Sequence, residues 1–179
     1  MKWVLGAMMV MSLAAGSTAS AQTAKCPPPP EWGATEKFGE WHAGRLCVSG
    51  TDMLRISARP QSKGLSSSLT LMCDADGPGG LLTLENSGVS GPVSLALGGA
   101  PAHRFDLEAS ELGVPGSKVT LIEFGDSDAV KAFLAALVDG PGPVFTLVLT
   151  AKGKPAYELA VSRNGLAAAV KPLRSQCAW

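Results

Sequence analysis

Histidine, the side chain most often used in acid–base catalysis, is nearly absent from this sequence. The 179 residues include only His42 and His103, which stand far apart in the chain. There is no Gly-x-Ser-x-Gly elbow to hold a nucleophilic serine. If His103 lies on a strand, Asp106 projects to the opposite face, so the two side chains do not pair. We therefore predict no catalytic residue and no enzymatic activity.

Complete metal and cofactor motifs are also missing. Asp74, Asp76 and Gly77 resemble the start of a calcium loop, but Pro78 occupies a ligand position and the later glutamate is absent. No glycine-rich stretch is followed by the lysine and helix of a phosphate-binding loop. We predict no bound metal and no cofactor.

An excess of one charge sign is missing as well. The 15 Lys and Arg residues balance 15 Asp and Glu residues, whereas proteins that bind nucleic acid or anionic lipid present a basic surface. We predict neither of these as a partner. Neither Asn86 nor Asn164 begins an Asn-x-Ser/Thr glycosylation acceptor, which fits a bacterial envelope protein.

The first residues have the composition of a secretory signal peptide. Lys2 supplies a positive start, Val4 to Leu13 is almost entirely apolar, and Ala19, Ser20 and Ala21 form a small-x-small cleavage site. The apolar run is too short to anchor the protein in a membrane. We predict that residues 1–21 are removed and that the mature chain is periplasmic or secreted, without membrane insertion.

The chain has four cysteines, an even number that indicates two disulfides in an oxidising compartment. Three connectivities exist for such a set. We favour Cys26 with Cys47, which closes a short N-terminal loop, and Cys73 with Cys177, which ties a central strand to the C-terminal helix. A zinc site is the alternative, but no Cys-x-x-Cys pair is present.

Residues 22–44 are predicted to form a lead-in to the folded domain. Pro27 to Pro30 make a polyproline run, which is stiff and extended. Trp32 and Trp41 follow it. These tryptophans either cap one end of the core or stack on a ligand, so both are candidate binding residues. A single β-rich domain is predicted for residues 45–179.

From Leu46 onward, short apolar stretches alternate with turn sequences. Successive stretches are spaced by about 8 to 12 residues, which is typical of antiparallel strands and not of βαβ units. We predict a mainly β fold, an antiparallel β-sandwich-like domain with two short helices. The alternative is an α+β fold, an open antiparallel sheet with helices on one face. Strands are expected at residues 46–49, 53–58, 67–73, 81–85, 93–97, 104–108, 118–124, 144–149 and 157–161.

Two segments have helical periodicity. Asp126 or Ser127 can cap the first helix, and Gly140 ends it. The second runs from about 166 to 173 and contains Pro172, which is expected to kink or divide it. The first helix has an apolar stripe made of Val130, Phe133, Leu134, Leu137 and Val138.

Several stretches resemble those of a group of bacterial periplasmic proteins. One strand ends in Leu69-Thr-Leu-Met-Cys73, and a later hairpin and helix carry Tyr157-Glu-Leu-Ala-Val161, Leu166-Ala-Ala-Ala-Val170 and Leu173-Arg-Ser-Gln-Cys177. Over residues 40–179, the chain resembles the invasion-associated locus B family and accessory proteins associated with type VI secretion. The resemblance implies a periplasmic accessory or interaction protein with no established catalytic residues. It also supports a disulfide between Cys73 and Cys177.

These observations leave two hypotheses of different classes. In the first, the chain is an accessory protein that binds another envelope or secreted protein over a broad face. In the second, it is an inhibitor of a periplasmic hydrolase or a carrier of a small ligand. The inhibitor hypothesis needs a protruding loop, for which we select residues 86–91, with Ser87 and Ser90 as its binding residues.

Overall fold

The computed structural model describes residues 35–48, 51–74, 77–98, 100–125 and 127–177. The predicted signal peptide, the proline run, Cys26 and Trp32 lie outside these residues. The described residues form ten strands in one antiparallel sheet, together with three helices. The prediction of a mainly β fold is confirmed.

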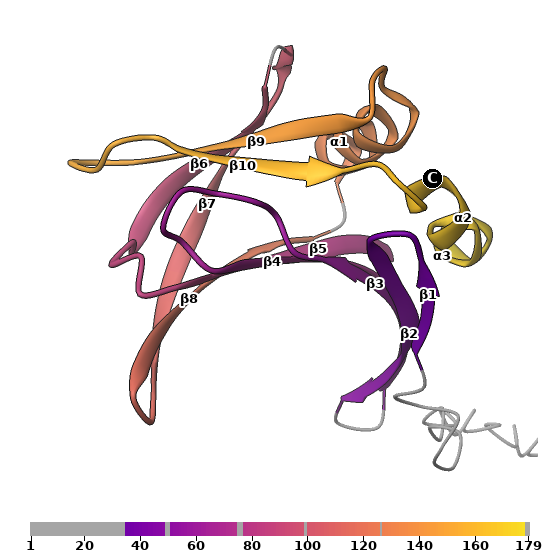
Figure 1. The fold of residues 1–179 in the computed structure, drawn as a ribbon, viewed down its shortest axis with the longest axis horizontal. Coiled ribbons are helices and arrows are strands. Elements are labelled where there is room, and N and C mark those ends of the chain that lie inside the picture. Colours follow the sequence, from indigo (N-terminus) through magenta and orange to yellow (C-terminus); the bar gives the residue numbers. More distant parts are fainter. Residues whose placement is uncertain (1–34, 49–50, 75–76, 99, 126, 178–179) are drawn as a thin grey trace, which may run out of the picture.

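The elements follow one another along the chain as strands, one helix, a hairpin and two short helices (Figure 1). They are β1 (Thr35–Phe38), β2 (Trp41–Val48), β3 (Thr51–Ala58), β4 (Ser67–Asp74), β5 (Gly77–Glu85), β6 (Gly91–Leu97), β7 (Ala100–Val114), β8 (Ser117–Phe124), α1 (Asp128–Asp139), β9 (Val144–Ala151), β10 (Tyr157–Ser162), α2 (Leu166–Ala169) and α3 (Lys171–Cys177).

The strand order across the sheet is β1-β2-β3-β4-β5-β8-β7-β6-β9-β10. The chain leaves sequential order twice, because residues 86–90 lead from β5 to β6 and α1 leads from β8 to β9. The sheet curves so that β9 and β10 lie over β4 and β5 (Figure 1). A bridge between Gln61 and Ala160 joins the two layers through N···O hydrogen bonds of 2.7 and 2.9 Å. One sheet therefore supplies both layers of a sandwich-like arrangement.

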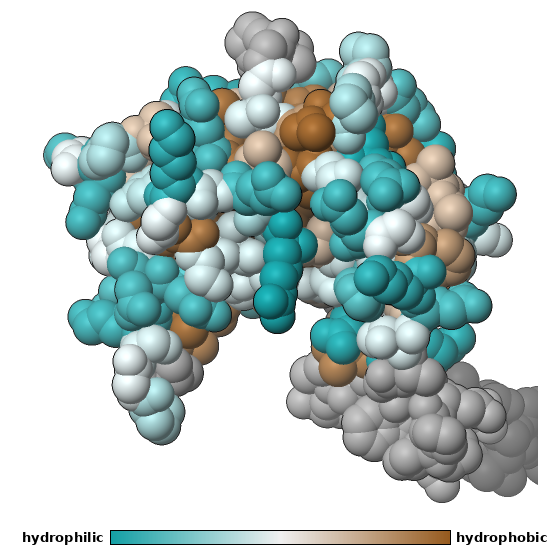
Figure 2. All heavy atoms as spheres, viewed as in Figure 1, coloured by the Kyte–Doolittle hydropathy of each residue, from teal (hydrophilic) through white to brown (hydrophobic). Residues whose placement is uncertain are grey.

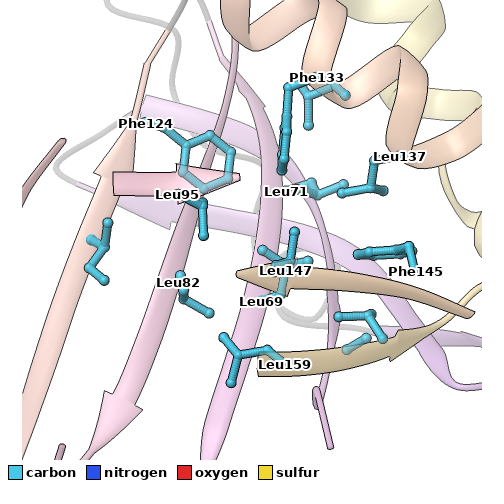
Figure 3. Close-up of a cluster of buried hydrophobic side chains, with 14 of the residues drawn as sticks. Leu69, Leu71, Leu82, Leu95, Phe124, Phe133, Leu137, Phe145, Leu147 and Leu159 are labelled. Atoms are coloured by element: carbon cyan, nitrogen blue, oxygen red, sulfur yellow. The ribbon is translucent and has the colours of Figure 1, made fainter. Parts of the chain in front are cut away.

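The inward-facing side chains of both layers form one hydrophobic core. In β4, Leu69, Leu71 and Cys73 are all fully buried, as their alternation predicts. Figure 3 shows leucines of β4 and β5 gathered with those of β6, β9 and β10, including Leu95 and Leu147. Full burial of one leucine stabilises a fold by roughly 1.5–3 kcal/mol, so this core is the main source of stability.

Strand β7 changes its partner along its length. It pairs with β6 up to Ala109, and from Ala109 to Val114 it pairs with β8. The sequence predicted only residues 104–108 of this strand, because the exposed side chains at 110–113 have no alternating apolar pattern. We call residues 109–122 the β7–β8 hairpin.

Helix α1 packs against β7 and β8 at the place where these two strands separate. Its N-cap is Ser127, as predicted, and the Oγ of this serine accepts a hydrogen bond from the Val130 N–H at 3.1 Å. The ring centroid of Phe133 lies 5.0 Å from that of Phe105 on β7 and 5.9 Å from that of Phe124 on β8. These edge-to-face contacts fix the helix against both strands.

The C-terminal segment is tied to the sheet by a disulfide. Cys177 of α3 is bonded to Cys73 of β4, with their Cα atoms 6.0 Å apart, as predicted. Val170 separates α2 from α3, and Pro172 lies in the first turn of α3, where its missing N–H is not needed. The prediction that this proline divides the helix is confirmed.

The second predicted disulfide cannot be compared with the structure. Cys26 lies outside the described residues, and the side chain of Cys47 is not among those described. The pairing of these two cysteines stays a prediction.

The sheet begins at Thr35, inside the segment predicted to be a lead-in. Strand β1 was missed because most of its side chains are polar and exposed, without the period of a half-buried strand. Trp41 on β2 is fully buried, and its indole N–H donates a hydrogen bond of 2.8 Å to the Ser162 carbonyl oxygen. Trp41 therefore caps the core. This corrects its selection as a candidate binding residue, because its ring has no exposed surface for a ligand.

Candidate interaction surface

The side of the sheet turned away from the core is open over its central strands. In Figure 1, the three helices lie on the opposite side of β3, β4 and β5. On these strands and on β8, a set of side chains that alternate with the buried ones is half-buried. We call them the outer face: Arg55, Ser57, Ser68, Thr70, Met72, Leu81, Thr83, Val119 and Leu121.

The outer face is concave. Figure 1 shows the β7–β8 hairpin at the left and the β2–β3 hairpin at the right, both projecting from the same side of the sheet. The hollow beneath the body of the protein is visible in the space-filling view (Figure 2). Hydroxyl and apolar side chains occupy its centre, since Thr70, Thr83 and Leu81 lie there on neighbouring strands. Such a face suits contact with another molecule better than an evenly charged surface does.

The β7–β8 hairpin carries an exposed apolar side chain. Leu112 is 50% exposed and lies directly opposite the half-buried Val119. On the opposite face of the hairpin, the Lys118 ammonium and the Glu111 carboxylate form an ion pair of 2.8 Å. The hydrogen bond from Lys118 to Glu111, together with the charge of that carboxylate, raises the pKa of Lys118. The hairpin thus presents a leucine on one face and a solvated ion pair on the other.

The loop selected for the inhibitor hypothesis does not protrude. Ser87 is half-buried, and its Oγ lies 2.8 Å from the Oγ1 of Thr120 on β8. Val89 is 1% exposed, and its carbonyl oxygen accepts a hydrogen bond of 2.9 Å from the same Thr120 hydroxyl. The Tyr157 hydroxyl donates to the Ser87 carbonyl oxygen at 3.2 Å. Of the two predicted binding serines, only Ser90 is exposed.

His103 lies apart from the outer face, in a pocket of about 560 Å³ beside the C-terminal end of α1. Arg163 lines the same pocket, but its guanidinium is held by backbone oxygens. Its Nε donates to the Leu137 carbonyl at 3.0 Å, and its Nη1 donates to the Pro141, Gly142 and Val144 carbonyls. Burial lowers the pKa of Arg163. This arginine therefore secures the helix end and the following loop.

Two features are missing from the described residues. Within them, no three His, Cys, Asp or Glu side chains are grouped so as to hold a metal ion. None of their helices has the length and hydropathy to cross a membrane.

The fold is that of a mainly β protein built from one curved antiparallel sheet, with its C-terminal helix bonded to a central strand. A solved structure with a similar fold is the invasion associated protein B of Bartonella henselae. The two superpose with a TM-score of 0.54 and share 21% sequence identity, over 79% of this chain and 95% of the other. No family model and no curated protein sequence matches this chain. The likeness shows a shared fold and agrees with the first family named from the sequence, while the relation to type VI secretion proteins stays a prediction.

Neither the outer face nor Leu112 was predicted from the sequence. The exposed side chains at 110–113 have no alternating apolar pattern, so the strand that carries Leu112 was not expected. Polar and apolar residues alternate along residues 67–73, and this alternation indicated which side chains of β4 face outward.

Proposed function

We propose that this chain is a secreted, non-enzymatic accessory protein that binds another envelope or secreted protein through its outer face and β7–β8 hairpin. The observation that carries the proposal is Leu112, an apolar side chain half exposed on a projecting hairpin beside a concave face. Exposed apolar groups clustered at such a place mark interaction sites more often than isolated ones do. The half-buried Val119 and Leu121 extend this apolar surface towards the hollow.

Two other observations support it. A disulfide between distant elements fits an oxidising compartment, as the signal-peptide prediction requires. The name of the structural neighbour associates that protein with invasion, a process that involves contact between surfaces.

The test uses the oxidised mature protein, residues 22–179, as bait against the solubilised envelope of its source. Leu112→Asp is compared with Val144→Asp, a matched control, because Val144 is 48% exposed and lies on β9, away from the hairpin. We expect one saturable partner that the wild type and the Val144 variant retain. For the purified partner, Leu112→Asp is expected to weaken binding by about tenfold or more, as at an interface hot spot. Equal binding by both variants, at unchanged thermal stability, would contradict the proposal.

The projecting hairpin also favours a second candidate, an inhibitor that places this tip in the cleft of a hydrolase. Pro115 and Gly116 at the tip are exposed, as an inserted turn requires. Inhibition of a periplasmic hydrolase that Leu112→Asp abolishes would favour this candidate over the accessory role.

A further inference from the structure

A basic pocket lies at the β1 end of the sheet, on the same side as the outer face. Its volume is about 490 Å³. The polar side chains that line it come from four strands, the β1–β2 turn and the residue that follows β3. They are Lys37, Glu40, His42, Ser57, Arg59 and Ser68.

The strand register explains why these side chains converge. Lys37 lies directly opposite His42, and His42 lies directly opposite Ser57. Cβ atoms of directly opposite residues are about 4.5–5.5 Å apart and point to the same side of the sheet. Arg59 lies two residues after Ser57. Because successive side chains alternate between the two faces of a sheet, Arg59 lies on the same side as Ser57.

The donors of the pocket have no protein partners in the described part of the chain. No carboxylate of the described residues lies within ion-pair distance of Lys37 or Arg59. The hydroxyl groups of Ser57 and Ser68 likewise make no hydrogen bond to other described residues. Two cations and two hydroxyl donors therefore face one hollow without a hydrogen-bond partner among the described residues.

Glu40 limits the charge of the pocket. With Lys37 and Arg59 positive and Glu40 negative, the fixed charges sum to a single positive charge when His42 is neutral. This charge matches one carboxylate and is too small to neutralise a doubly charged phosphate. A guanidinium also binds a carboxylate through two parallel hydrogen bonds, a geometry that Arg59 can supply.

We propose that this pocket binds the carboxylate of an acidic segment in the protein partner. The proposal rests on the proposed function, because it takes the outer face as the binding surface and adds the chemistry of one contact. Lys37 and Arg59 hold the carboxylate oxygens, and Ser57 and Ser68 donate further hydrogen bonds. The segment then continues along the hollow towards Leu112 and the β7–β8 hairpin.

The test titrates ¹⁵N-labelled oxidised protein, residues 22–179, with the peptide acetyl-Ser-Glu-Leu-Glu-Ser-amide, its Gln counterpart, sodium acetate and inorganic phosphate. We expect the Glu peptide to shift the backbone signals of Lys37, His42 and Ser57, and the Gln peptide to leave them in place. Lys37→Ser and Arg59→Ser are each expected to weaken Glu-peptide binding by about three- to tenfold. Added salt should weaken it as well.

Glu40→Gln tests whether a change of charge in the pocket acts in the expected direction. Removal of the competing carboxylate should tighten Glu-peptide binding. Lys152→Ser, in the exposed turn between β9 and β10, is the matched control and should change nothing. Equal binding of the Gln peptide, tighter binding of phosphate, or acetate binding with no binding of the Glu peptide would each overturn the proposal. These outcomes are separate from the effect of Leu112→Asp on partner capture, so either idea can fail while the other stands.

Discussion

The indole N–H of Trp41 donates a hydrogen bond to the carbonyl oxygen of Ser162, a residue 121 positions further along the chain. This contact joins the start of β2, beside one edge strand of the sheet, to the end of β10, the other edge strand. The indole ring is also fully buried.

Trp41→Phe should therefore measure the contribution of this hydrogen bond to the free energy of unfolding. Phenylalanine keeps part of the ring volume but leaves the Ser162 oxygen without this donor, which we expect to cost about 1–3 kcal/mol of unfolding free energy. Trp41→Ala adds a cavity and should cost about 3–5 kcal/mol. Urea denaturation of both variants measures these differences. Equal stability of the Phe variant and the wild type would show that water replaces the indole donor.

Removal of the Cys73–Cys177 disulfide should destabilise the protein strongly. The bond closes a loop with a sequence separation of 104 residues, for which loop-closure entropy gives about 4–5 kcal/mol. The double variant Cys73→Ala/Cys177→Ala is compared with the wild type by denaturant unfolding under oxidising conditions. Peptide mapping of the wild type should also yield a Cys26–Cys47 fragment. A fragment that joins Cys47 to Cys177 would contradict both assignments.

Gly165 should tolerate no side chain. Its φ is +87°, and a Cβ atom at this position would collide with the Phe38 carbonyl group of β1. Gly165→Ala is therefore expected to lower the unfolding free energy by more than about 2 kcal/mol, because strain and collision add.

Gly153 provides the matched control for Gly165. Its φ is +73°, but nothing lies within 4 Å of an added Cβ atom. Gly153→Ala should cost only the backbone strain of about 1–2 kcal/mol. Similar losses in the two variants, measured by thermal unfolding, would mean that β1 moves away from Gly165 at little cost.

Arg163→Met should loosen the end of α1. The substitution removes the hydrogen bonds to the Leu137, Gly142 and Val144 carbonyls and the cation–π contact with Phe145, where the guanidinium lies 5.2 Å from the ring centroid. We expect a loss of about 2 kcal/mol and faster amide exchange in residues 137–144. Arg163→Lys should recover only part of the loss, because an ammonium cannot reproduce the fork of donors. Full recovery by lysine would assign the effect to charge alone.

The sequence predicted the parts of this fold that depend on local periodicity. Leu69, Leu71 and Cys73 follow the period of a half-buried strand, and the buried face of β4 resulted as expected. Pro172 acts through its own missing N–H, so its effect on the C-terminal helix was also predictable.

What the sequence did not reveal depends on distant partners. The loop at 86–91 has the polar composition of a protruding turn, yet Ser87 is drawn inward by Thr120, which lies 33 residues away. Strand β1 was missed because three of its four side chains are polar and exposed, so it carries no hydrophobic pattern. The pocket of Lys37, His42 and Arg59 arises from cross-strand register, which single-sequence periodicity does not specify.

The bond between Cys73 and Cys177 also divides the chain into a covalent ring and a tail. The ring contains β5 to β10 and all three described helices, whereas β1, β2 and β3 precede it. A protease that cuts once inside the ring leaves the two pieces joined, so the nicked protein keeps its mass until a reductant is added. After a cut between β3 and β4, the bond between Cys73 and Cys177 does not join the two pieces. Only non-covalent strand pairing then holds β1, β2 and β3, with their basic pocket, against the rest of the sheet.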